Sequence, residues 1–275
     1  MALPMASERR ICRVLGVGRS GSRSVRKNSL GILNRHSVIE SRLRELIQIH
    51  PTFGYRRLWA LLRFKEGYSI NVKTVHRLVR KNGWQVTIRA KSAKPRVKAS
   101  CSRASMSNER WAMDITHIPC GIDGWGHLAA IIDCHDRELV GYEFALRGRA
   151  KEAERALENA CLHRFGTLRP KHSMPRLRSD NGLIFQSRHF RATCRDYKLS
   201  QEFITPYTPE QNGMVERFFR SLKEECVWQH NFRDFNTASR TVNRWLAWYN
   251  QERPHQSLGY KSPVEFRAQK LQMMA

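Results

Sequence analysis

The chain has 275 residues, of which 41% are hydrophobic, enough for one medium domain with a packed core and one or two smaller ones. It carries 49 Lys and Arg against 24 Asp and Glu, and the formal net charge of +25 favours a polyanionic partner because each neutralised phosphate releases counterions. The seven cysteines are scattered along the chain, which argues against a disulfide scaffold or a zinc module. The sequence has no signal peptide and no long apolar stretch, which predicts a cytoplasmic protein with no membrane partner.

Residues 1–35 are predicted to be a basic N-terminal arm that contains a possible helix-turn-helix. Ile11, Val14 and Leu15 have helical spacing, and Gly16 begins a turn before a second basic stretch. That second stretch is rich in Gly and Ser, which are weak helix formers. A flexible basic arm is therefore a close alternative.

Residues 36–86 have the pattern of a helical module. Ser37 and Glu40 indicate a capping box at the start of a first helix. A second helix is expected over about residues 55–67, and Asn71 is a suitable N-cap for a third. Three short helices, the last of them capped and basic, are typical of a module that reads the major groove of DNA.

Basic side chains on these helices are the candidate DNA contacts of the module. They are Arg56, Arg57, Lys73, Arg77, Arg80 and Lys81. The alternative is a packing module whose charges are merely solvated. Residues 87–108 follow as a basic linker that could track a DNA backbone.

Residues 109–268 change to alternating strands and helices, before a short tail at 269–275. Strands are predicted over residues 111–119, 127–134, 140–146 and 201–204, with another ending at Asp180; helices are predicted over 151–165, 187–196 and 236–250, with another bearing Glu216. This order implies an α/β fold with a mixed five-stranded sheet flanked by helices.

Three acidic residues in three contexts are the candidate catalytic and metal-binding residues. Asp114 lies in an alternating strand, Asp180 ends a strand before Asn-Gly, and Glu216 lies near the start of a helix. The first two are separated by residues 115–179, 65 positions, and the last two by residues 181–215, 35 positions. Each acid taken alone is weak evidence for a metal site, because acidic residues are common on surfaces and as turn caps. Together, converging within a few ångströms, they could hold two divalent cations for in-line displacement at phosphorus.

The helix of Glu216 adds two candidate DNA contacts. Arg220 and Lys223 follow Glu216 at i+4 and i+7 and share its helix face. A carboxylate followed by two cations suits a metal site beside a phosphate track. A solvated Glu–Arg pair is the alternative for this helix taken alone.

Several motifs of the chain together match a known family. They are PTFGYRRL at 51–58, VHRL at 75–78, WAMDIT at 111–116, SDNG at 179–182, PEQNGMVE at 209–216, YNQERPH at 249–255 and LGYKSP at 258–263. Through them the chain resembles the OrfB-type transposases of bacterial insertion sequences, members of the DDE (retroviral-integrase-like) superfamily. The resemblance covers nearly the whole chain, and the 35-residue interval before the glutamate is the family's hallmark.

The resemblance implies a ribonuclease H-like catalytic core behind an N-terminal all-α helix-turn-helix-like module. It assigns metal coordination to Asp114, Asp180 and Glu216, with two Mg²⁺ ions and Mn²⁺ as the alternative, and assigns Lys223 to the transposon-end phosphates. It also implies a homo-oligomer on DNA, association with the nucleoid, and action with, or as a fusion to, the upstream-frame OrfA product.

The expected function is DNA transposition by metal-dependent cleavage at insertion-sequence ends and strand transfer into target DNA. A catalytically inactive DNA-binding protein or repressor from a decayed element is the main alternative. A ribonuclease of the same fold that acts on RNA–DNA hybrids, and a structural partner that acts only with another subunit, also stay open.

Overall fold

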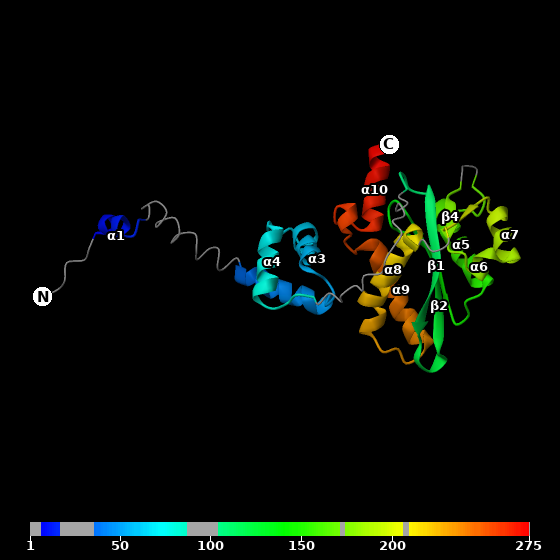
Figure 1. Cartoon of the computed structure of the whole chain (residues 1–275), viewed down its shortest axis with the longest axis horizontal. Coiled ribbons are helices and arrows are strands. Elements are labelled where there is room, and N and C mark those ends of the chain that lie inside the picture. Colours follow the sequence, from blue (N-terminus) through cyan, green and yellow to red (C-terminus); the bar gives the residue numbers. More distant parts are fainter. Residues whose placement is uncertain (1–6, 17–35, 87–103, 171–173, 206–208, 275) are drawn as a thin grey trace. The chain divides into compact units, whose positions relative to one another are not determined.

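The computed structural model describes residues 7–16, 36–86, 104–170, 174–205 and 209–274 (Figure 1). The chain divides into two units, residues 1–86 and 87–275. Helix α1 spans Glu8–Val14, where the sequence predicted the first half of a helix-turn-helix. The second half of that motif, and most of the predicted basic linker, lie outside the described residues.

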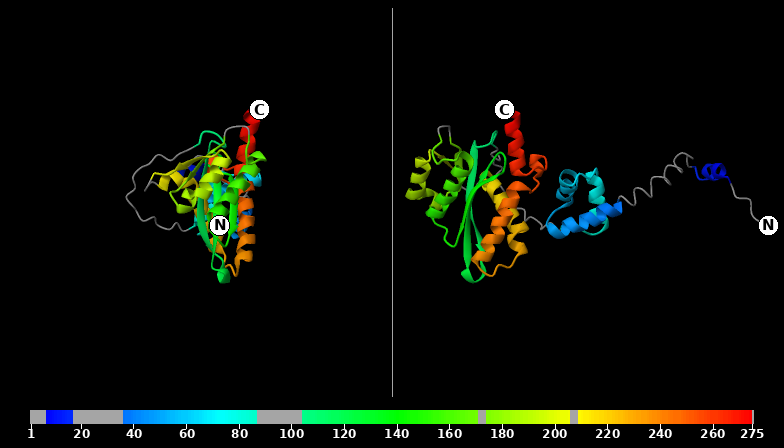
Figure 2. Two further views of the ribbon diagram at one scale, coloured as in Figure 1. Left: turned by 90° about the vertical axis from the view of Figure 1, so that its right-hand side faces the viewer. Right: turned by 180° about the vertical axis from the view of Figure 1, so that it is seen from behind.

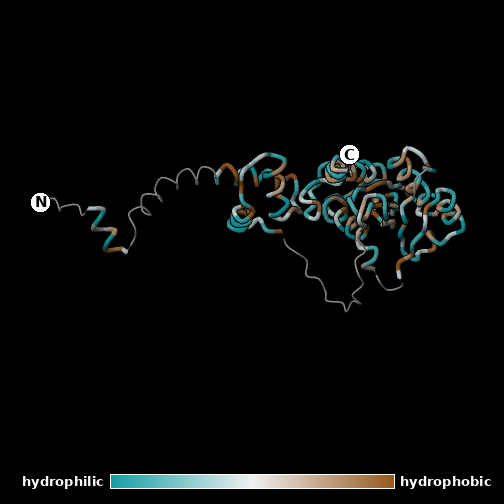
Figure 3. Tube along the Cα trace, turned by 90° about the horizontal axis from the view of Figure 1, so that it is seen from above, coloured by the Kyte–Doolittle hydropathy of each residue, from teal (hydrophilic) through white to brown (hydrophobic). Residues whose placement is uncertain are grey.

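The first unit contains the three helices that the sequence predicted. They cover residues 36–49, then α3 at Tyr55–Ala60 continued by a π-helical turn η1 at Leu61–Lys65, and α4 at Val72–Lys81. The tube in Figure 3 shows hydrophilic and hydrophobic residues alternating along the helices, as one-sided burial requires. Buried aliphatic residues from all three helices form the core, among them Leu43, Leu58, Leu62 and Val75.

The caps of these helices were predicted with mixed success. The Asn71 side chain accepts a hydrogen bond from the Lys73 backbone N–H at 2.8 Å, so Asn71 is the N-cap of α4 as predicted. The capping box is wrong, because residue 36 is already helical and Ser37 therefore lies inside the helix.

The second unit is built on a mixed five-stranded sheet, as predicted. Its strands are β1 Arg110–Pro119, β2 Trp125–Asp133, β3 Leu139–Ala145, β4 Arg176–Ser179 and β5 Ser200–Phe203, in the order β3-β2-β1-β4-β5. The first three strands are antiparallel neighbours, while β4 pairs parallel with β1 and β5 pairs parallel with β4. The change from antiparallel to parallel pairing therefore falls between β1 and β4.

Helices cover both faces of this sheet (Figures 1 and 2). On one face lie α5 Ala150–Phe165, α6 Leu183–Gln186 and α7 Arg188–Asp196, and on the other α8 Gly213–Glu225 and α9 Phe235–Gln251. Short 3-10 turns lie at η2 Gly121–Asp123, η3 Pro209–Asn212, η4 Val227–Gln229 and η5 Gln256–Leu258. No helix of the described segments is long and apolar enough to cross a membrane.

Two helices were missed by the sequence analysis. Helix α6 has only four residues, too few for a periodic pattern to be recognised. Helix α10 spans Pro263–Met274, so the residues predicted as a tail from 269 onward continue a helix. Its apolar residues do not gather on one face, and Leu271 and Met273 are exposed, which explains why periodicity did not indicate it.

A buried group of charges ties α10 to the sheet and to α5. The carboxylate of Glu138, just before β3, lies 2.8 Å from Arg267 of α10, 2.9 Å from His163 and 3.4 Å from Arg164 of α5. Arg164 also binds Asp136 at 3.0 Å, and both side chains are almost completely buried. Buried charges are tolerated when they are paired in this way.

Candidate active site

The side chain of Asp114 lies on the face of the sheet that is covered by α8, the helix that carries Glu216. Ala112 and Ile118 pack in the core cluster that contains α8 and α9, whereas Trp111 and Met113 pack in the cluster formed with α5, α6 and α7. Since side chains alternate along a strand, Asp114 faces the α8 side. One of its oxygens accepts the backbone N–H of Ile115 at 2.7 Å.

Asp180 is set beside Asp114 by the register of two parallel strands. Ala112 on β1 is aligned with Arg178 on β4, so Asp114 and Asp180 each come two residues after an aligned pair, and the charge of Asp180 acts on the pKa of Asp114. Adjacent strands are separated by about 4.8 Å. The Asp180 carboxylate accepts the Gly182 backbone N–H at 2.9 Å, and a Cβ on Gly182 would lie only 2.9 Å from that same oxygen. The glycine therefore keeps room for the carboxylate at the strand end.

The start of α8, which carries Glu216, is fastened to the sheet by two hydrogen bonds. Buried Asn212 donates its amide to the Met113 carbonyl at 3.4 Å, directly before Asp114 in the chain. Arg178 donates to the Gln211 carbonyl at 3.0 Å. These bonds hold the first turn of α8, and with it the exposed side chain of Glu216, next to β1 and β4.

Arg178 is itself held by a carboxylate. Glu202 on β5 accepts from Arg178 at 2.8 Å and from Arg110 on β1 at 3.0 Å. Burial acts to raise the pKa of Glu202, but the hydrogen bonds and charges of the two arginines outweigh it and hold that pKa below its usual range. The ion pairs of Glu202 with Arg110 and Arg178 thus link β1, β4 and β5 next to the site.

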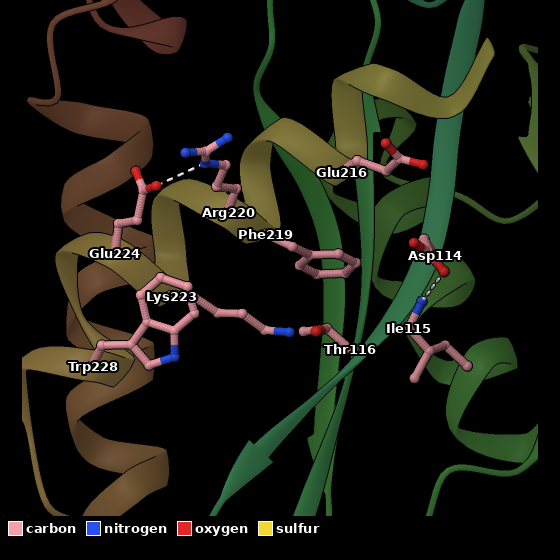
Figure 4. Close-up of a pocket in the computed structure, with 9 residues that line it drawn as sticks. All are labelled: Asp114, Ile115, Thr116, Glu216, Phe219, Arg220, Lys223, Glu224 and Trp228. Atoms are coloured by element: carbon pink, nitrogen blue, oxygen red, sulfur yellow. Dashed lines mark hydrogen bonds and ion pairs between the residues drawn. The ribbon is translucent and has the colours of Figure 1, made fainter. Parts of the chain in front are cut away.

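Asp114 and Glu216 line one pocket of about 470 Å³ between β1 and α8 (Figure 4). Both carboxylates point into it, and Lys223 extends from α8 toward Thr116 on β1. The other lining residues are Ile115, Phe219, Arg220, Glu224 and Trp228. Asp180, although described, is not part of this lining.

Negative charge accumulates around Asp114. Burial is the largest cause that raises the pKa of its carboxyl, to about 6, and repulsion from Asp180 and Glu216 acts in the same direction. The Ile115 N–H and the Lys223 ammonium oppose the rise but do not cancel it. A divalent cation would offset this uncompensated charge, and carboxylate oxygens are the ligands that Mg²⁺ and Mn²⁺ prefer.

The donor chemistry of the three acids therefore fits divalent ions. In their present side-chain positions, however, no three Asp, Glu, His or Cys residues of the described chain stand close enough together to hold one ion. The structure brings Asp114 and Glu216 into one pocket and lets the charge of Asp180 act on Asp114.

The two cations predicted next to Glu216 are found in different situations. Lys223 is partly buried in the pocket, close enough to influence the pKa of Asp114. Arg220 lines the same pocket but its guanidinium pairs with Glu224 at 2.7 Å. Glu224 and Trp228 also line the pocket and were not predicted as site residues, although both continue the i, i+4 spacing that begins at Glu216.

In the first unit, α4 presents most of the predicted DNA contacts. Its buried residues face the core, and Lys73, Arg77, Arg80 and Lys81 are exposed. Lys81 lies 3.3 Å from Glu40, so part of its charge is neutralised within the unit. On α3, Arg56 is exposed, whereas Arg57 is partly buried, with its guanidinium 4.6 Å from the centre of the Phe53 ring.

Comparison with protein families matches both units. An HTH-like domain matches residues 35–92, and two models, each described as an integrase core domain, match residues 104–209 and 197–263. An insertion element IS476 protein of 39.2 kDa from Xanthomonas euvesicatoria is 32% identical over 95% of this chain and 72% of its own length. The transposase InsD of insertion element IS2 from Escherichia coli is 30% identical over 82% of this chain and 78% of its own.

Among solved structures, the chain is similar to one in the simian T-cell lymphotropic virus intasome, solved in complex with PP2A regulatory subunit B56 gamma. The TM-score is 0.50 at 19% identity, over 82% of this chain and 74% of the other. At that identity the likeness concerns the fold, and it confirms the predicted ribonuclease H-like core. The matched domains and the two relatives show that the chain belongs to the insertion-sequence DNA transposases. These are enzymes of the DDE superfamily that transfer polynucleotide strands.

Proposed function

We propose that this transposase cleaves and joins DNA at a centre formed by Asp114, Asp180 and Glu216. The observation that supports this most is the charge around Asp114, where a largely buried carboxylate is repelled by the other two and its pKa is raised to about 6. Strongly raised carboxyl pKa values of this kind are frequent at functional sites. The shared pocket and the strand register support the same centre.

Two divalent ions, Mg²⁺ or alternatively Mn²⁺, would be held by the oxygens of these three carboxylates. When bound, they would supply Lewis-acid stabilisation to the attacking and leaving oxygens of an in-line displacement. The chain's own contribution is to fix the carboxylates on β1, after β4 and on α8, and to place the Lys223 ammonium beside a phosphate in the pocket.

The reaction needs no covalent bond to the protein. In cleavage, water attacks a phosphorus at the insertion-sequence end, and the bond to the 3′-oxygen breaks to release a 3′-hydroxyl. In strand transfer, that hydroxyl attacks a target phosphodiester, so one phosphodiester forms as another breaks.

DNA would be held by both units. We assign the transposon end to the exposed cations of α4, with Arg56 and Arg57 beside them, and the reacting phosphate to Lys223 and Arg220. The enzyme would act as a homo-oligomer on DNA, associated with the nucleoid, and together with the upstream-frame OrfA product or as a fusion with it. The high positive charge of the chain supports phosphate contacts along much of its length.

Single substitutions of the three acids test the proposal. Asp114→Asn, Asp180→Asn and Glu216→Gln should each abolish Mg²⁺-dependent cleavage of a duplex that carries the element's terminal repeat, while binding of that duplex persists. Asp196→Asn, at an exposed position on α7, is the matched control and should cleave normally. If any of the three variants cleaves as well as the wild type, the substituted residue is not part of the catalytic centre. A wild-type chain that binds the duplex but never nicks it with Mg²⁺ or Mn²⁺ would favour the inactive repressor.

A further inference from the structure

Trp228 is a large aromatic residue held at the edge of the pocket. Its side chain is 57% exposed, whereas Trp111 and Trp245 of the same unit are 0% and 8% exposed. A tryptophan that is left open to water beside a charged pocket is unusual, because burying its ring is strongly favourable. Exposure of this kind is common where the ring contacts a ligand.

The backbone around Trp228 is held by core packing and by hydrogen bonds. Its neighbours Cys226 and Val227 are 2% and 3% exposed and pack in the core cluster of α8 and α9. The Gln229 side chain donates to the Glu224 carbonyl at 3.0 Å, and His230 contacts the Cys226 carbonyl at 2.8 Å. The turn η4 is therefore packed against the core directly after the end of α8.

The pocket changes in chemistry from one end to the other. Figure 4 shows the carboxylates of Asp114 and Glu216 at one end, Lys223 in the middle and the indole of Trp228 at the other end. Phe219, 6% exposed, adds an apolar part to the wall. A volume of about 470 Å³ lies within the usual range of small-ligand sites. Anion binding next to an aromatic face is what a nucleotide needs, since it carries a phosphate and a flat base.

We propose that Trp228 is a stacking platform for an unpaired nucleobase at the DNA end, with Lys223 on the phosphate that leads to it. The inference depends on the proposed function, because the reacting phosphate must lie at the acids. Glu216 lies about two and a half helical turns before the end of α8, and Trp228 lies in the turn η4 directly after it, so the base belongs to a nucleotide within a few positions of that phosphate. The base must be turned out of the duplex and thus unpaired, because inside the duplex both of its faces are stacked on neighbouring bases.

The test measures whether Trp228 and one base act together. The full-length protein is titrated with terminal-repeat duplexes in which single nucleotides near the cleavage position are made abasic, without divalent ions and at about 50 mM salt, where phosphate contacts are strong. Loss of one stacked base should weaken wild-type binding by roughly 5- to 150-fold. The same abasic site should change binding of Trp228→Ala by about twofold or less, and Trp228→Phe should retain most of the wild-type response.

Trp125→Ala is the matched control, since Trp125 is 60% exposed but does not line the pocket. It should respond to each abasic site as the wild type does. If the losses caused by Trp228→Ala and by every abasic site simply multiply, Trp228 does not stack on a base and the proposal fails. If Trp228→Ala changes only the oligomeric state, Trp228 belongs to a protein interface and the proposal also fails. Because binding is measured without catalysis, these outcomes are separate from loss of cleavage in the acid variants.

Discussion

Replacing Asp114 with neutral Asn should stabilise the protein while removing its activity. Burial, with repulsion from Asp180 and Glu216, raises the pKa of Asp114 from 3.8 to about 6. At 1.36 kcal/mol per pKa unit, the charged carboxylate destabilises the folded state by about 3 kcal/mol at neutral pH. For a unit of this size, Asp114→Asn should raise Tm by roughly 6–12 °C. This is an upper value, because the Asp114 side chain is not fully buried.

The effect has a defined pH dependence. Between pH 3.8 and about 6 the folded state binds the Asp114 proton more tightly than the unfolded chain does. The stabilising contribution of this group is therefore fully present below pH 3.8 and is lost as pH rises through about 6. The variant and the wild type should melt at similar temperatures near about pH 4 and differ most above about pH 7.

The assay is thermal unfolding of the full chain in EDTA across this pH range. Asp196→Asn, with its exposed side chain, is the control and should shift Tm little at any pH. Adding Mg²⁺ should stabilise the wild type more than Asp114→Asn, because a ligand that binds only the folded state raises its stability. The reasoning is refuted if Asp114→Asn melts at or below the wild type at about pH 8, or if the difference does not depend on pH.

Three further predictions test other parts of the structure. Arg253→Ala should lower the free energy of unfolding by about 3–5 kcal/mol in urea, because Glu225 would stay buried without the guanidinium that binds both its oxygens; an unchanged midpoint would contradict this. Gly121→Ala should destabilise by about 1–3 kcal/mol, since φ is +59° and the new Cβ would lie 2.1 Å from a backbone oxygen, whereas Gly213→Ala has open space and should be neutral or stabilising in the same assay. Arg77→Ala on α4 should weaken DNA binding and reduce the slope of log K against log salt by about 0.9, and an unaltered slope would exclude a phosphate contact.

The strands, and the face of β1 on which Asp114 lies, could be predicted because they depend on local pattern. Alternation along residues 111–119 indicates both the strand and the face on which Asp114 lies, and β1 spans Arg110–Pro119. The position of Asn71 before an apolar helical pattern likewise predicted a cap that the structure contains. These features need only the periods of strands and helices and the chemistry of caps.

Other features depend on contacts between residues that are far apart in the sequence. Asn212 and Met113 are 99 positions apart, and their hydrogen bond holds α8 beside β1. The raised pKa of Asp114 likewise depends on burial and on charges that follow β4 and lie on α8. Trp228 could be recognised as part of the pocket only after the helix face was known. Periodicity in one segment carries no information about these distant partners.

The ion pair between Glu138 and Arg267 has a consequence for shortened forms of this transposase. A nonsense mutation between codons 252 and 263, after α9, would remove α10 and with it the arginine at 2.8 Å from that buried carboxylate. The truncated product would retain every residue proposed to touch DNA or metal, yet its interior would hold an acid with less compensating charge. Loss of the last turns alone could thus silence a copy of the element through proteolysis, with its reaction centre intact in the gene.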